Sequence, residues 1–259
     1  MLKPLLTRLA FAMGGARLYR ACVDWRRGEH PLRILSLHRV IDTDGPLNEA
    51  DCRDLARGCL SLSAFERRIR YLRRRYTIVH LDDCLRELAA GQPLPPYALA
   101  LTFDDGHGDV GANVFPVLQT LGVPFAVFVT TGFVDRPGML RRARIAEMAA
   151  LGAGLIAWGA HGVTHRALTD LPAREAEEEI VRSKLELEAM VGATVSLFSY
   201  PDGKYDATLR AAVARHGFVG ACATGRTVNW APVDRFALQR IPCESEPLSR
   251  FAFRVAGRV

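Results

Sequence analysis

The chain has 259 residues, of which 49% are hydrophobic and 24% are charged. This composition excludes a disordered chain and is sufficient for one large α/β domain with its own core. The formal net charge of +6 is accompanied by no helix-turn-helix, zinc-finger or RNA-binding signature, so we expect no nucleic-acid partner. The six cysteines include no C-x-x-C pair, which favours small buried residues over a disulfide framework.

The first 30 residues form a basic segment that precedes the predicted main domain at 31–259. Arg8 interrupts its apolar run, which leaves a stretch too short for the core of a signal peptide or for a bilayer-spanning helix. The mixture of apolar and arginine residues predicts an amphipathic helix that lies either on a membrane surface or on the domain itself. We therefore expect a cytoplasmic or membrane-peripheral location rather than a secreted or periplasmic one.

Eight runs of β-branched, aromatic and small residues lie beside glycine or proline and predict strands. They cover residues 32–37, 76–81, 97–103, 124–130, 154–160, 195–200, 218–224 and 236–241. Ser63 and Glu66 have the spacing of a capping box, which predicts the start of a helix. Helices are also predicted over 172–191, which begins with acids, and over 206–216, which Gly217 ends. Apolar strands alternating with helices indicate a parallel sheet, as a (β/α) barrel or a doubly wound fold.

Polar side chains follow several of these runs. Asp104 and Asp105 come directly after the third run, in LTFDDG, and His161 and His165 come after the fifth, in HGVTH. His38 ends the first run, in LSLHRV. Because reactive groups gather where parallel strands end, in both architectures, we expect these side chains to lie at one edge of the sheet.

Two histidines four residues apart share one face if the turn is helical, and a nearby carboxylate would complete a three-ligand site with open positions. Catalytic zinc and non-haem iron both use such a set. Either motif alone has a simpler explanation, as a pair of surface histidines or as a loop or helix cap. Together they favour a metal site, in which the cation offsets the repulsion between Asp104 and Asp105. One carboxylate would bind the cation while the other accepts a proton from water.

The motifs TFDDG, HGVTH and FSYPDG, in this order, resemble those of the polysaccharide deacetylases of carbohydrate esterase family 4, which share the NodB homology domain. The opening ILSLHRV resembles the branch of this family that deacetylates exopolysaccharides and has an N-terminal histidine motif. The resemblance implies a distorted (β/α) barrel of about seven to eight parallel strands over residues 31–259. It also implies an active site at the C-terminal ends of the strands. The implied reaction is the metal-dependent hydrolysis of N-acetyl groups on N-acetylhexosamine units of a glycan.

The same resemblance implies roles for five side chains. Asp104 corresponds to the general base, and Asp105, His161 and His165 correspond to the metal ligands. His38 corresponds to the general acid that protonates the departing sugar amine. The expected cofactor is zinc, with cobalt, nickel or manganese as alternatives. These roles are chemically consistent, because a divalent cation polarises a carbonyl and a histidine titrates in the useful range.

The turn at Tyr200, Pro201 and Asp202 is where the family places its oxyanion donor, and the backbone N–H of Asp202 is the candidate here. Tyr200 is either a substrate-binding ring or a packing residue. Asp202 itself replaces a tyrosine that is common in this motif. A backbone donor survives that replacement, but the local charge differs.

Two further positions depart from the family pattern. Ser199 stands where the family often has an arginine that holds the base aspartate, and Arg240 is either its replacement or a solvated arginine. His107 stands where this branch often has a tyrosine, as a residue of the site's rim or as a fourth ligand. The orientation of Asp104 is therefore the least determined part of the predicted site.

Three alternative functions remain open. The first alternative is a hydrolase of the same fold that acts on a different amide or on an O-acetyl ester. Comparing activity on N-acetylhexosamine oligomers with activity on small amides would distinguish it from a glycan N-deacetylase. A non-catalytic glycan-binding relative is favoured by Ser199 and opposed by the complete set of acids and histidines. An iron- and oxygen-dependent enzyme would leave Asp104 without a task, and a requirement for oxygen and a 2-oxoacid would identify it.

Overall fold

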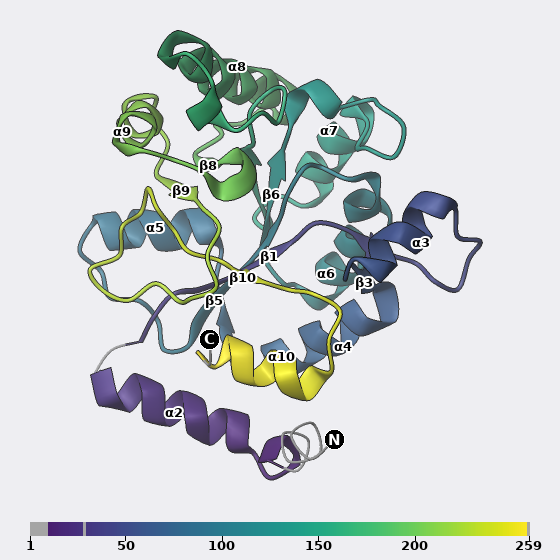
Figure 1. The fold of residues 1–259 in the computed structure, drawn as a ribbon, viewed down its shortest axis with the longest axis vertical. Helices are drawn as coiled ribbons and strands as arrows, with labels where there is room; N and C mark the ends of the chain where they lie inside the picture. The colour runs from purple at the N-terminus through teal and green to yellow at the C-terminus, as the bar shows by residue number, and fades with distance from the viewer. Residues whose placement is uncertain (1–9, 28–29, 258–259) are drawn as a thin grey trace.

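The computed structural model describes residues 10–27 and 30–257, and Arg8 of the predicted basic segment lies outside them. Its main sheet is parallel and has the strand order β10-β1-β5-β6-β7-β8-β9, with β4 beside the start of β5 (Figure 1). The strands are β1 Arg33–Leu37, β4 Thr77–Ile78, β5 Ala98–Phe103, β6 Phe125–Val129, β7 Ile156–Ala160, β8 Leu197–Ser199, β9 Gly220–Cys222 and β10 Ile241–Pro242. The predicted α/β barrel is confirmed.

One irregular segment links the two ends of this sheet. Leu238 donates its N–H to the Ala221 carbonyl at 3.0 Å and accepts from the Ala223 N–H at 2.8 Å, beside β9. A few residues later, Ile241 pairs in parallel with Leu35 of β1. The segment therefore lies between β9 and β1 and closes the sheet into a barrel. Because the segment is irregular, the barrel is distorted.

Most helices lie on the outside of the sheet and bury its outer face, whereas a second cluster of apolar side chains buries its inner face. The helices are α2 Gly15–Arg27, α3 Glu49–Ala56, α4 Leu62–Arg73, α5 Leu81–Ala89, α6 Phe115–Leu121, α7 Arg142–Leu151, α8 Ala173–Val191, α9 Ala207–Arg215 and α10 Leu248–Val255. Side chains alternate along each strand. In β5, Leu99 and Leu101 pack toward the helices, whereas Ala98 and Ala100 join a smaller inner cluster with Phe128. The apolar runs of the sequence are thus explained by burial on both sides.

Several predicted boundaries differ from the structure. Helix α4 begins at Leu62, and its cap is Ser61, whose hydroxyl accepts from the Ala64 N–H, so the predicted capping box at Ser63 is wrong. The reason is that Ser61 ends the short strand β3 (Leu60–Ser61) in extended geometry, one residue before the helix. Strand β3 pairs in parallel with β2 (Val40–Ile41), and neither was predicted. The real capping box is at Asn48, which opens α3.

The predicted strands at 76–81 and 236–241 are much shorter than expected. The first is reduced to β4 because α5 already begins at Leu81. The second is reduced to the bridge at Leu238 and to β10, because Arg240 turns into the interior between them. The helices predicted over 172–191 and 206–216 are confirmed as α8 and α9.

Helix α2, in the predicted N-terminal segment, packs against α10 and thus lies on the domain (Figure 1). Its buried face is charged. The Arg20 guanidinium lies over the rings of Tyr76 and Tyr97, at 4.6 and 3.9 Å from their centroids, and Asp24 accepts a 2.9 Å hydrogen bond from Arg33. Within residues 10–27 and 30–257, no helix combines the length and hydropathy that crossing a bilayer requires.

Candidate active site

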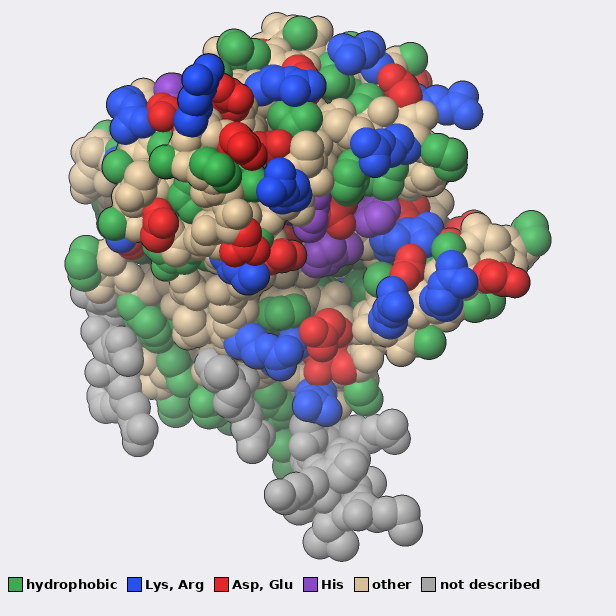
Figure 2. Space-filling model, turned by 45° about the horizontal axis from the view of Figure 1, so that its top comes forward, with side chains coloured by type: hydrophobic (Ala, Val, Ile, Leu, Met, Phe, Trp, Pro, Cys, Tyr) green, Lys and Arg blue, Asp and Glu red, His purple; other side chains and the backbone are tan. Residues whose placement is uncertain are grey.

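The side chains predicted to react lie at the C-terminal ends of the strands, as expected. His38 follows β1, the pair Asp104 and Asp105 follows β5, and His161 follows β7. The Asp104 N–H donates to the carbonyl of Leu37 at 2.9 Å, which fixes the end of β5 beside the turn that carries His38. Figure 2 shows histidine and acidic side chains together in a hollow of the surface, beside the projecting α3 segment.

Asp105, His161 and His165 converge on a single point. Oδ1 of Asp105 lies 3.1 Å from Nε2 of His165 and 3.5 Å from Nε2 of His161, and the three ligand atoms all lie within 4.8 Å of one another. Among the described residues, no hydrogen bond satisfies this buried Oδ1. A buried carboxylate oxygen that faces two imidazole nitrogens fits a divalent cation, which prefers this donor set.

The surroundings set the charge and the tautomer of these ligands. Burial alone would raise the pKa of Asp105, but the adjacent imidazoles of His107, His161 and His165 lower it far below its ordinary range, so the carboxylate is ionised. Nδ1 of His161 lies 2.7 Å from the carbonyl oxygen of Ser199. Because a carbonyl can only accept, Nδ1 carries the proton and the lone pair of Nε2 is free for a cation.

The turn between the two histidines is not helical. Residues 161–165 form an irregular loop, in which Gly162 has φ +71° and His165 has φ +60°. The left-handed backbone at Gly162 interrupts any helix directly after His161. The two rings nevertheless meet, with centroids 4.9 Å apart, and the ring of Phe133 stacks on His165 at 6.1 Å.

Asp104 is held by Arg240. Nη1 of Arg240 lies 2.7 Å from Oδ1 of Asp104, and only 2% and 4% of the two side chains are exposed. The same guanidinium donates to the Ser199 hydroxyl at 3.1 Å and to the Ala223 carbonyl at 2.9 Å. Burial alone would raise the pKa of Asp104, but the charge of Arg240, its hydrogen bond and the neighbouring His161 together lower it. Of the two alternatives for Arg240, the structure therefore places it against the aspartate, and Ser199 is its neighbour.

The turn after β8 differs from one expectation. The Tyr200 side chain is fully buried, its hydroxyl donates to the Phe236 carbonyl at 3.1 Å, and its ring stacks on Tyr205 with centroids 5.2 Å apart. It is a packing residue, and a sugar-binding role for this ring is wrong because no face of it is accessible. Pro201 is buried as well, whereas Asp202 is exposed and has φ +56°.

The comparisons with known proteins agree with this geometry. Residues 91–221, just over half of the chain, match the family model of polysaccharide deacetylases. The chain belongs to the polysaccharide deacetylase family. The family expected from the three sequence motifs is thereby confirmed.

Individual relatives of this chain are distant in sequence. It is 30% identical over 113 residues to YxkH of Bacillus subtilis (strain 168), and the match covers 43% of the chain but only 39% of that relative. IcaB from Ammonifex degensii has a TM-score of 0.71 at 25% identity, covering 88% of this chain and 98% of that structure. The deacetylase PplD from Streptococcus pyogenes, in complex with acetate, has a TM-score of 0.73 at 18% identity over 89% of this chain and 99% of that structure. At that identity PplD supports the fold alone.

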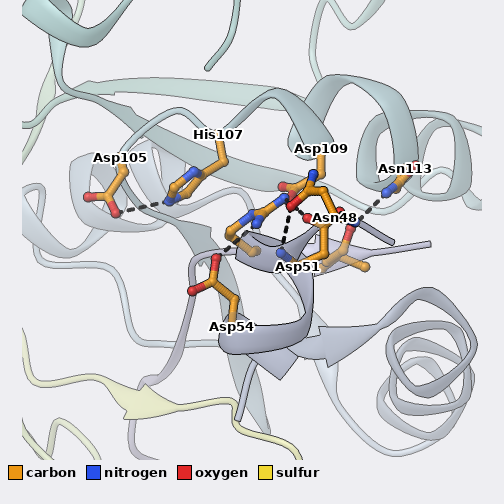
Figure 3. Close-up of polar contacts among 9 residues, drawn as sticks. Asn48, Asp51, Asp54, Asp105, His107, Asp109 and Asn113 are labelled. Atoms are coloured by element: carbon orange, nitrogen blue, oxygen red, sulfur yellow. Dashed lines mark hydrogen bonds and ion pairs between the residues drawn. The ribbon is translucent and has the colours of Figure 1, made fainter. Parts of the chain in front are cut away.

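Sequence reasoning missed one residue beside the candidate site, Arg39, directly after His38. Its guanidinium donates to Asp109 and Asp54 at 2.8 Å and to Asp51 at 3.0 Å. These acids come from the loop after β5 and from α3 (Figure 3). Arg39 therefore joins the turn of His38 to both. The signal in the sequence is the pair Asp51 and Asp54, three residues apart on one helix face.

His107 contacts the other oxygen of the candidate ligand. Its Nε2 lies 3.3 Å from Oδ2 of Asp105, and Figure 3 shows the ring directed at that carboxylate. The candidate metal group comprises Asp105 and the histidines of the HGVTH loop, without His107. In this arrangement His107 orients the carboxylate from the side opposite to the proposed cation.

Proposed function

We propose that this protein removes N-acetyl groups from a polysaccharide or oligosaccharide of N-acetylhexosamine units. The proposed cofactor is a divalent cation, with zinc as the first candidate, bound by Asp105, His161 and His165. The observation that carries the proposal is the convergence of both Nε2 atoms on the unsatisfied Oδ1 of Asp105, next to the buried pair of Asp104 and Arg240. Membership of the deacetylase family supports the reaction class.

Asp104 is suited to act as the general base. A cation bound at the three ligands would polarise the acetyl carbonyl and make water more acidic. Asp104 is the residue next to the ligand Asp105 and stays ionised through Arg240, so it is able to accept the proton that water loses as it adds to the acetyl carbon. Arg240 also fixes the carboxylate orientation, which the missing arginine at position 199 would otherwise provide.

The remaining steps use residues at the ends of strands β8 and β1. The backbone N–H of Asp202, in the turn after β8, is the proposed donor to the oxyanion that forms on the acetyl oxygen. The C–N bond then breaks, and the sugar amine takes a proton from His38 while acetate leaves. His38 is exposed, which agrees with a group that meets a large substrate at the surface.

The decisive experiment combines metal analysis with acetate release from chitooligosaccharides. We expect one divalent cation and turnover for the wild type, retained cation without turnover for Asp104→Asn, and loss of both for His161→Ala. Equal acetate release by the wild type and Asp104→Asn would refute the base assignment. Acetate release only from O-acetylated glycans or from small amides would move the activity to one of the alternative substrates on the same fold.

A further inference from the structure

Helix α8 carries six glutamates, and one of them differs from the rest. Five form ion pairs with basic side chains. These pairs are Glu175 with Arg166, Glu177 with Arg215 and His216, Glu178 with Arg174, Glu186 with Arg182, and Glu188 with Lys184. Glu179 forms no ion pair within 4 Å among the residues that the structure describes, although Arg182 is near enough to feel its charge. Its carboxylate instead accepts hydrogen bonds from a loop.

Glu179 binds the loop that carries the two histidines. Its Oε2 accepts from the backbone N–H of Val163 at 2.6 Å and of Thr164 at 2.9 Å, and its Oε1 accepts from the Thr164 hydroxyl at 2.9 Å. Val163 and Thr164 lie between His161 and His165 in the sequence. A half-buried carboxylate thus satisfies two consecutive backbone donors of the loop, and such charge-assisted bonds are stronger than neutral ones.

The opposite side of the loop is held as well. The backbone N–H of Thr131 donates to the Gly162 carbonyl at 3.1 Å, and that of Gly132 donates to the Val163 carbonyl at 3.0 Å. A Cβ atom on Gly132 would collide with that carbonyl oxygen, so the approach requires glycine. The loop is therefore fixed between the 131–132 backbone on one side and Glu179 on the other.

We propose that Glu179 is a positioning residue that sets the metal affinity of the site. The inference rests on the cation site of the proposed function. His165 has a left-handed backbone, which is unfavourable for a residue with a side chain and persists only where surrounding contacts enforce it. Glu179 supplies three of those contacts. Without them the loop relaxes, and Nε2 of His165 leaves the point where it faces Asp105.

The test compares three single variants by zinc titration against a chromophoric chelator. In Glu179→Ala, both backbone donors lose their acceptor, and we expect the zinc Kd to rise about 10- to 100-fold, as for other residues that support metal ligands. Glu179→Gln keeps an oxygen for the two N–H groups and should recover most of the affinity. The matched control is Glu178→Ala, which removes only the exposed pair with Arg174 and should leave the Kd unchanged.

Further measurements separate positioning from folding. The Tm of metal-free Glu179→Ala should match that of Glu178→Ala within a few degrees, and excess zinc should restore its turnover. If Glu179→Ala does not fold, Thr164→Val removes one of the three contacts, and we expect a Kd about two- to tenfold weaker, equivalent to one hydrogen bond.

A wild-type Kd in Glu179→Ala, or in Thr164→Val where that variant replaces it, would overturn the inference. So would a Glu179→Gln variant as weak as the alanine variant, since charge rather than hydrogen bonding would then be responsible. Zinc binding by the wild type without any acetate release would refute the proposed reaction alone and leave this comparison valid. A wild type that binds no zinc would refute both.

Discussion

Replacing Arg240 with methionine should destabilise the protein strongly, because it leaves the Asp104 carboxylate buried without a counter-charge. The two side chains are 2.7 Å apart and almost fully buried. Removal of one partner from a buried ion pair typically costs about 3–5 kcal/mol. Methionine has a similar length and leaves little cavity, so the loss of charge and of hydrogen bonds dominates the effect.

The size of this effect is large relative to the stability of a domain. Native domains are stable by about 5–15 kcal/mol, so Arg240→Met would remove a substantial part of that. For a chain of this length, about 2–4 °C of Tm accompanies each kcal/mol, which predicts a decrease of roughly 6–20 °C. Urea unfolding followed by circular dichroism measures the change directly.

A double-mutant cycle tests the cause. Asp104→Asn alone leaves the Arg240 charge unpaired, whereas the double variant has no buried charge at this position. We expect the double variant to be less destabilised than the sum of the two single variants, by up to about 3 kcal/mol. Arg210→Met, in an ion pair whose side chains are 40% and 44% exposed, should cost at most about 1 kcal/mol. Additive effects within about 0.5 kcal/mol would refute the coupling of Arg240 to Asp104.

Three further outcomes are expected. Gly132→Ala should weaken zinc binding in a calorimetric titration, because its Cβ displaces the Val163 carbonyl, and an unchanged Kd would contradict this. Arg39→Met leaves three carboxylates facing one another. Burial raises the pKa of Asp109, so the loss of stability in urea should be larger at pH 7 than near pH 4.5, where Asp109 takes up a proton; a pH-independent loss would argue against this cluster. Ellman's reagent at pH 8 should titrate the exposed thiols of Cys22 and Cys52 in the native protein. Burial raises the pKa of three other thiols to about 12, those of Cys84, Cys222 and Cys243. These thiols should react only after denaturation, and their rapid reaction in the native protein would contradict their buried placement.

The positions of the acids and histidines were predictable because they follow from a general property of parallel sheets. Each motif directly follows an apolar run, and all such ends lie at one edge. That rule places Asp105 and His161 together without any knowledge of the loops. It does not give the backbone path of a loop. A helical turn would have placed the two histidines on one face, but the chain instead has a left-handed backbone at Gly162.

The contacts of the two arginines were harder to predict, because their partners are remote in sequence. Arg240 and Asp104 are 136 positions apart, and only the insertion of one irregular strand brings them together. A single sequence cannot distinguish such an arginine from a solvated one. Arg39 is similar, since its acceptors lie on α3 and on the loop after β5. The helix cap at Ser61 was missed for a local reason, because the strand that precedes it has only two residues.

The segment that lies between β9 and β1 is synthesised late, so the residues of the candidate site leave the ribosome in a defined order. The ribosome makes β1 first among the strands of the barrel and β10 last, although the two pair side by side. A nascent chain that ends at residue 221 already contains every proposed metal ligand and the whole stretch matched by the family. It lacks Arg240, whose guanidinium pairs with the buried carboxylate of Asp104. The proposed metal ligands are therefore synthesised before Arg240, the arginine that holds the proposed base.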